Sequence, residues 1–209
     1  NVTGVRETGI TAVTPAGTAG ARNVVVVTTL GSGSLTGGFT YLAAPTITGV
    51  APSSGPLAAG TSITITGTNF VTDGLAVTVG GTAATSVVRV SATEITAATP
   101  AGTAGAKDVV VTTNGGTDTE TGGFTYLAPP VVNGVSPGSG PIGGNTTITI
   151  TGLSFTGATG VTVGGAAATN VTVVSDTRIT AVTPAGTAGA RNVVVVTPLG
   201  SGSLTGGFT

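Results

Sequence analysis

The sequence predicts an all-β fold made of tandem two-sheet antiparallel β-sandwiches, and three observations predict it. First, β-branched residues alternate with polar residues in short runs, as in strands with one buried face. Second, clusters of glycine and proline interrupt these runs about every 8–12 residues, which is typical of sandwich turns. Third, no segment keeps the 3.6-residue apolar period of a helix.

Two motifs recur at offsets of 84 and 85 residues, a period suited to a small autonomous domain. Thr-Pro-Ala-Gly-Thr-Ala-Gly-Ala begins at Thr14, Thr99 and Thr183, and Thr-Gly-Gly-Phe-Thr begins at Thr36, Thr121 and Thr205. We therefore expect the C-terminal half of a unit at 1–41 (the N-terminal segment) and complete units at 45–126 (the middle unit) and 130–209 (the third unit).

The repeats differ in how closely they match. Residues 1–40 equal residues 170–209 at 35 of 40 positions, but they equal residues 86–125 at only 24 of 40. A longer period of 169 residues, two units long, thus begins again at Asn170. We expect the chain to be part of a longer tandem array.

The first three strands of the middle unit follow from its alternation. Thr46–Val50 precedes a turn cluster at Ala51–Pro56. Thr61–Thr66 alternates strictly, which places its isoleucines inward and its threonines outward. Leu75–Val79 alternates in the same way and ends at Gly80-Gly81.

Four more strands complete the middle unit. Val88 and Val90 indicate the fourth, and Ile95 and Ala97 indicate the fifth, which Pro100 stops. The sixth begins at Val109–Val111, and the seventh carries Phe124 and Tyr126. The third unit repeats the pattern at Ile148 and Ile150, Val161 and Val163, Ile179 and Ala181, Val193–Val196, and Phe208. We expect the inward Ile, Val and Phe side chains to form one core in each unit.

Composition excludes most chemistry. The chain has six basic and seven acidic residues, a net charge of −1, and no Cys, His, Met or Trp. Thiol and imidazole catalysis and His/Cys zinc binding are therefore absent, and no basic field exists for nucleic acid. The longest apolar run, Val24–Val27, is too short to span a membrane. We predict no enzyme activity and no catalytic, cofactor-binding or metal-binding residues.

Two sets of charged residues are candidate sites. Asp118 and Glu120 could form a catalytic carboxylate pair or a weak calcium site; their counterparts in the other repeats are Gly and Leu, which favours a solvated hairpin. A cation recurs at Arg22, Lys107 and Arg191. It is interpreted as an edge charge or a cap on loop carbonyls, with an inter-domain or inter-chain contact as the alternative.

The remaining motifs are typical of surface loops. Gly31-Ser-Gly-Ser and Gly200-Ser-Gly-Ser lack the Gly-Lys-Ser/Thr and the helix of a phosphate loop, so they predict hairpin turns. Asn1, Asn145 and Asn170 begin N-glycosylation sequons, which so threonine-rich a chain also produces by chance. Exposed threonines could carry O-linked sugars instead.

The order of these landmarks resembles the IPT/TIG domain family across nearly the whole chain. The resemblance rests on Pro45–Pro52, Ser54-Gly55-Pro56, Gly60–Phe70 and the Gly-Gly-Phe-Thr-Tyr ending at Tyr126, and on Pro130, Pro137, Ser139-Gly140-Pro141, Gly143-Gly144 and Ile148–Phe155. Leu153-Ser154 departs from the usual Thr-Asn, and no closing Tyr follows Phe208-Thr209. The resemblance implies an immunoglobulin-like sandwich used as a spacer or interaction module, in the style of bacterial secreted or surface proteins.

These observations favour a non-catalytic segment of an extracellular or cell-surface fibre, stalk or adhesin. The alternative is a set of accessory carbohydrate- or protein-binding domains in a larger secreted enzyme or receptor. We expect self-association into a fibre or continuation of a longer array, because a nearly uncharged surface favours association. The N-terminal segment alone would expose an apolar face, so we expect preceding sequence or strand addition from a neighbouring subunit to complete it. No nucleic-acid partner and no membrane span are expected.

Overall fold

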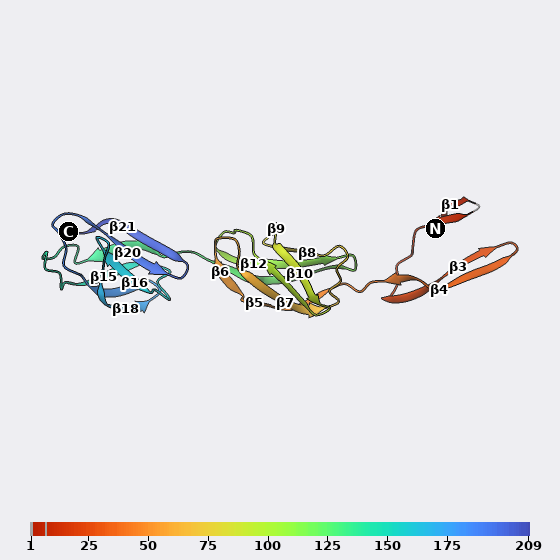
Figure 1. Cartoon of the computed structure of the whole chain (residues 1–209), viewed down its shortest axis with the longest axis horizontal. Coiled ribbons are helices and arrows are strands. Elements are labelled where there is room, and N and C mark those ends of the chain that lie inside the picture. Colours follow the sequence, from red (N-terminus) through yellow and green to blue (C-terminus); the bar gives the residue numbers. More distant parts are fainter. Residues whose placement is uncertain (1, 7) are drawn as a thin grey trace. The chain divides into compact units, whose positions relative to one another are not determined.

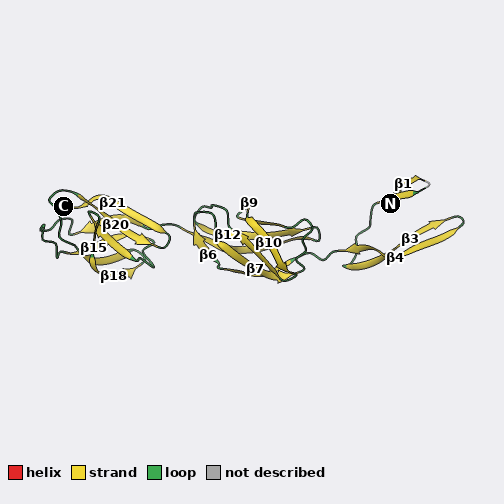
Figure 2. Ribbon diagram, viewed as in Figure 1, coloured by secondary structure: helices red, strands yellow, loops and turns green. Residues whose placement is uncertain are grey.

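The computed structural model describes residues 2–6 and 8–209, and all regular structure within those residues is β-strand (Figures 1 and 2). In the N-terminal segment, β1 (Val2–Arg6) pairs with β2 (Gly9–Ala12), and β3 (Gly20–Thr28) pairs with β4 (Gly31–Tyr41). Both pairs are antiparallel two-stranded sheets.

The middle unit contains two sheets whose inner faces are apolar. One has the order β10 (Thr85–Ser91), β11 (Glu94–Ala98), β7 (Ser62–Thr68) and β5 (Thr46–Ala51). The other has the order β6 (Ser54–Pro56), β13 (Gly116–Leu127), β12 (Gly105–Thr113), β8 (Ala76–Val79) and β9 (Thr82–Ala83). In β7 the isoleucines are buried and the flanking threonines are not, as the alternation predicts.

The third unit has the same two-sheet plan. One sheet has the order β14 (Val131–Ser136), β15 (Thr147–Leu153), β19 (Arg178–Val182) and β18 (Thr169–Ser175). The other has the order β17 (Ala166–Ala167), β16 (Gly160–Val163), β20 (Arg191–Thr197) and β21 (Gly200–Phe208). The predicted seven-strand pattern is thus confirmed, and the structure adds the short strands β6 and β9 in the middle unit and β17 in the third unit.

One strand differs from the sequence prediction in its orientation. Val88 and Val90 lie on β10 as expected, but they are 54% and 56% exposed. β10 is the edge strand of its sheet, and its pairing with β11 contains two register shifts. Its opposite face carries Arg89, whose Nε donates a hydrogen bond to the Phe70 carbonyl oxygen at 2.5 Å. Val88 and Val90 therefore lie on the predicted fourth strand, but they do not belong to the core that the inward valines form.

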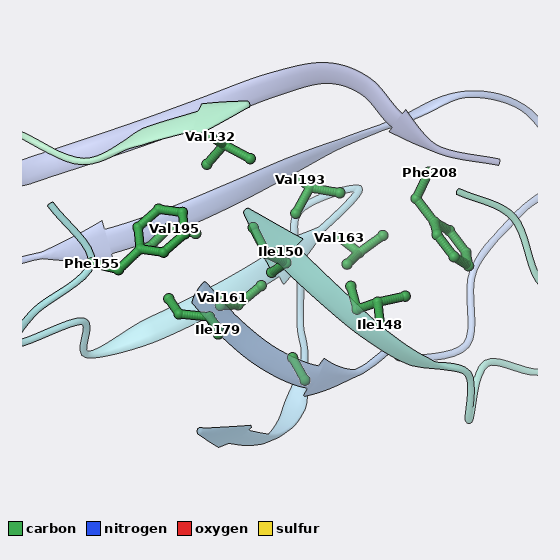
Figure 3. Packing of buried hydrophobic residues seen from close by; sticks show 11 residues of the cluster. Val132, Ile148, Ile150, Phe155, Val161, Val163, Ile179, Val193, Val195 and Phe208 are labelled. Atoms are coloured by element: carbon green, nitrogen blue, oxygen red, sulfur yellow. The ribbon is translucent and has the colours of Figure 1, made fainter. Parts of the chain in front are cut away.

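The core of the third unit lies between its two sheets (Figure 3). It consists of Val132, Ile148, Ile150, Phe155, Val161, Val163, Ile179, Ala181, Val193, Val195 and Phe208. Both sheets contribute inward side chains, as the alternation requires. Each large side chain contributes about 1.5–3 kcal/mol by leaving water, so this cluster stabilises the unit without disulfides.

Two equivalent buried threonines differ in their hydrogen bonding. Thr183 Oγ1 accepts a hydrogen bond from the Thr146 amide at 3.1 Å. Thr99 is fully buried, yet its Oγ1 has no partner among the described residues. An unpaired buried hydroxyl costs about 1–3 kcal/mol, whereas removing the partner of a buried amide is destabilising by a similar amount.

We therefore expect Thr99→Val to stabilise the middle unit by about 1 kcal/mol and Thr183→Val to destabilise the third unit by about 1–2 kcal/mol. Amide hydrogen exchange under native conditions, resolved by mass spectrometry, measures the free energy of unfolding in each unit separately. The two substitutions have the same shape change, so each is the control of the other. Equal changes of the same sign in the free energies of unfolding of the two units would contradict the hydrogen bonding described for Thr99 and Thr183.

Candidate functional site

The most unusual surface is an apolar one on the N-terminal segment. Ile10 is 45% exposed and Val26 is 38% exposed, whereas their counterparts Ile179 and Val195 in the near-identical segment 170–209 are completely buried. Four apolar residues on β2, β3 and β4 are exposed although their counterparts in the third unit are buried: Ile10, Val24, Val26 and Phe39. We call this set the open face. Exposed apolar residues whose counterparts are buried in a near-identical segment indicate a surface that makes a contact.

The third unit shows what covers such a face. There, residues 130–169 supply β14–β17, and their side chains Ile148, Ile150 and Phe155 pack in one cluster with Ile179 and Val195 (Figure 3). The two halves of that core are consecutive in sequence. The open face is therefore the surface that a segment of this pattern buries.

A glycine in the last strand marks where the covering segment passes. A Cβ atom on Gly202 would lie 2.2 Å from the Pro130 carbonyl oxygen, so only glycine fits beside that backbone. Its counterpart Gly33 has nothing within 4 Å of the same position. Gly33 could therefore also lie beside a covering backbone, but no described residue occupies that position.

The hairpin under the open face already has the geometry of a complete unit. Asn23 Oδ1 accepts a hydrogen bond from the Gly37 amide at 3.0 Å, and Asn192 Oδ1 accepts one from Gly206 at 3.0 Å. Both glycines have positive φ, +63° and +64°, which disfavours any side chain there. Sequence analysis missed this bond, although an Asn or Asp 14 residues before the first glycine of Gly-Gly-Phe-Thr recurs in all three repeats.

The recurring cation caps a loop. The Arg191 guanidinium donates to the carbonyl oxygens of Thr187 at 3.1 Å and Ala188 at 3.2 Å. Arg22 donates to the Thr18 carbonyl oxygen at 3.2 Å. The interpretation as a cap on loop carbonyls is confirmed for these two arginines; the side chain of Lys107 lies against Gly80.

Asp118, one member of the Asp118–Glu120 pair, has a structural use. Asp118 Oδ2 accepts a hydrogen bond from the Ile47 amide at 2.6 Å, which joins β13 to β5. The expected solvated hairpin is corrected here, because Asp118 is half-buried and satisfies a backbone donor that lies 71 residues away. Within residues 2–6 and 8–209, no three Asp or Glu side chains gather as a metal site would require.

The other polar candidates are single surface features. The hydroxyl and amide of Thr156 donate to Asp176 Oδ1 at 2.7 and 3.2 Å, and these bonds lower the pKa of Asp176 below its ordinary value. A carboxylate held ionised in this way is a poor general acid. Asn145 and Asn170 are exposed, whereas the sequon at Asn1 lies outside the described residues.

Membrane insertion through a helix finds no support in the described part of the chain. None of its residues belongs to a helix of the length and apolarity that a membrane crossing requires.

Comparison with known proteins gives similarities over most of the chain. Fibrocystin-L from Homo sapiens is 33% identical over 153 residues, and Fibrocystin-L from Mus musculus is 34% identical over 110 residues. These matches cover 72% and 53% of this chain, but the chain spans only 4% and 2% of the two relatives.

Solved structures give a similar picture. SGBP-B from a complex xyloglucan utilization locus in Bacteroides uniformis is 25% identical, with 78% of this chain and 49% of that chain covered and a TM-score of 0.37. The I9–I11 tandem from titin is 11% identical, with 88% and 72% covered and a TM-score of 0.45.

The family match is the most specific comparison. The sequence model of the IPT/TIG domain matches residues 45–126 and again residues 130–209, which is more than half of the chain. Both matched segments have two sheets and an apolar interior, and their strand pairs are antiparallel except for the parallel pairing of β6 with β13. The expected immunoglobulin-like β-sandwich fold is therefore confirmed. The chain belongs to the IPT/TIG domain family and contains two of its domains in tandem.

Proposed function

We propose that this chain is a non-catalytic structural segment of an extracellular or cell-surface tandem array, such as a fibre, stalk or adhesin. The observation that carries the proposal is the open face, because a segment that is buried in residues 170–209 stands uncovered in its near-copy. A half-unit of this kind buries its apolar side chains only against a covering segment like residues 130–169. A net charge of −1 adds little repulsion between neighbouring units.

The unit boundaries 45–126 and 130–209 belong to this proposal, with residues 1–41 as the C-terminal half of a further unit. The half-unit is completed by a segment of the pattern of residues 130–169, joined directly ahead of Asn1. In the third unit the two halves are consecutive, and covalent linkage gives an effective concentration that a separate subunit lacks. The partner is therefore a stretch of the same polypeptide.

A fusion tests the completion. Residues 130–169 are joined to Asn1 of the full chain, and amide hydrogen exchange is followed in residues 20–28. We expect exchange there to slow by about 100-fold or more, because a buried strand opens only with its unit. Dye binding to exposed apolar surface should fall as well.

The matched control is the same fusion with threonine in place of the isoleucines that correspond to Ile148 and Ile150. This control keeps the length and strand propensity but lacks the core side chains, so it should leave exchange fast. If the unaltered fusion also leaves exchange fast, completion by this segment is wrong.

The structural role is tested on the native particle. Electron microscopy of cells and of the purified native protein should show filaments or surface-attached strings of beads. Dispersed monomers without any attachment would contradict the proposed function while leaving the fusion result untouched.

A further inference from the structure

The middle and third units each have a four-stranded sheet with one face turned away from the core. In the middle unit this face belongs to β5, β7, β10 and β11, and in the third unit it belongs to β14, β15, β18 and β19. We call these two surfaces the outer faces. Their side chains alternate with the buried isoleucines, and they are half-buried or exposed.

Among the described residues, each outer face has a single charged residue on its strands, and the two charges are opposite. Glu94 is the first residue of β11, and Arg178 is the first residue of β19. Each precedes a completely buried isoleucine, so each side chain points away from the core. The two residues hold the same position in their units, because Glu94 pairs with Thr66 and Arg178 pairs with the equivalent Thr151.

Neither charge is neutralised within the part of the chain that the structure describes. There, the Glu94 carboxylate and the Arg178 guanidinium form no hydrogen bond and no ion pair. The acidic residue close to Arg178 in sequence is Asp176, whose carboxylate accepts hydrogen bonds from Ser154 and Thr156 instead. Both charges are therefore available to a charge from another molecule.

The rest of each outer face suits another sheet. Short threonine side chains cover its centre, and such side chains let two sheets approach to about 10 Å. Exposed valines lie beside the charges: Val90 on β10 and its counterpart Val174 on β18 are 56% and 55% exposed. A similar surface with the opposite charge fits these faces in shape and in charge.

A two-fold arrangement would bring the opposite charges together. When two similar surfaces pack face to face about a two-fold axis, equivalent positions close to the axis lie opposite each other. A middle unit packed on a third unit thus sets Glu94 against Arg178, and Val90 against Val174 beside them. Two middle units would set carboxylate against carboxylate, and two third units would set guanidinium against guanidinium. Both of these like-charge pairings are unfavourable, so the charges select the mixed contact.

The size of the outer faces indicates that one such contact is weak. Strands of five to seven residues, four to a sheet, give an area of about 400 Å² for each face at the usual strand spacing. Two faces bury about 800 Å² together, which is less than a standard protein–protein interface buries. Each chain carries one face of each charge, so repeated contacts between chains would raise the overall affinity.

We propose that the outer face of the middle unit binds the outer face of the third unit in a second copy of this chain, with Glu94 opposite Arg178. The partner is a second copy because the complementary charge stands at the equivalent position of the same chain, and the other outward residues of these strands are uncharged. This contact adds a lateral surface to the proposed structural role and does not use the open face. Strings of beads without lateral pairing would leave the proposed function standing and this inference wrong.

Exchanging the charges tests the contact on the full chain. Glu94→Arg makes both outer faces positive, and Arg178→Glu makes both negative. We expect each variant alone to associate at least about ten-fold more weakly than the unaltered chain in sedimentation velocity, because like charges then face each other. An equal mixture of the two variants should regain association, and so should the chain that carries both substitutions.

Asp73→Arg is the matched control, because it changes the net charge by the same amount as Glu94→Arg in an exposed loop that follows β7. It should associate like the unaltered chain. Association through the open face would be the same in all these proteins, since neither charge lies on it. A mixture that associates no more strongly than the single variants, or an unaltered chain that stays monomeric at about 1 mM, would overturn the proposal.

Discussion

Ile179→Ala is expected to destabilise the third unit by about 2–5 kcal/mol, because it leaves a cavity in a closed core. Ile179 is 0% exposed. The same substitution at Ile10, its counterpart in the N-terminal segment, removes a side chain that is 45% exposed. There we expect a change within about 0.5 kcal/mol.

The pair is informative because residues 10–28 equal residues 179–197 throughout. The intrinsic strand propensity of this shared stretch therefore cancels in the comparison. Denaturant unfolding with hydrogen exchange resolved by segment measures both effects. A loss of several kcal/mol from Ile10→Ala would mean that the open face is covered in solution by the chain itself, contrary to the structure.

This pair also shows how far sequence alone could predict the fold. Alternating Ile and Thr in β7 and β15 predicted both the strands and their buried faces, because a half-buried strand needs a period of two. The same rule does not distinguish the exposed Ile10 from the buried Ile179; the repeat offsets do, because they show that residues 1–41 are only half of a unit. The burial of Ile179 depends on the covering segment 130–169, so the alternation within its own strand does not reveal it.

The misplaced valines of β10 have a related cause. Val88 and Val90 alternate as well as any core pair, but an edge strand with register shifts can turn either face inward. Strands of two or three residues, such as β6 and β9, are too short for any period to be visible.

The candidate sites were predictable only where their partners are close in sequence. The arginine caps involve residues three or four positions away, and a cap on loop carbonyls was anticipated. The hydrogen bond that Asp118 accepts was not predicted, because its donor, the Ile47 amide, lies 71 residues away. The packing of Gly17 against the Tyr41 ring and of Gly102 against the Tyr126 ring was missed, because a glycine in a loop indicates only a turn.

Gly152→Ala should be the most damaging single substitution of a small residue in the third unit. A Cβ atom there would lie 1.9 Å from the Val131 carbonyl oxygen and 2.4 Å from Phe155 Cζ. The first contact is with backbone that cannot move without breaking the pairing of β14 with β15, and the second is with a core ring. Overpacking of this kind costs about 3 kcal/mol or more.

Gly160→Ala is the control for Gly152→Ala. It makes the same chemical change at the start of β16, in the other sheet of the unit, where a Cβ atom meets nothing within 4 Å. Reduced freedom of the unfolded chain should make it neutral or stabilising by up to about 1 kcal/mol. Thermal unfolding of the two variants, followed by circular dichroism and by exchange in residues 130–209, should separate them clearly.

Gly67 has the same close contact with the Thr46 carbonyl oxygen, at 1.9 Å, so Gly67→Ala should damage the middle unit equally. Tolerance of alanine at both positions would mean that the first strand of each unit is not held against its neighbour as described.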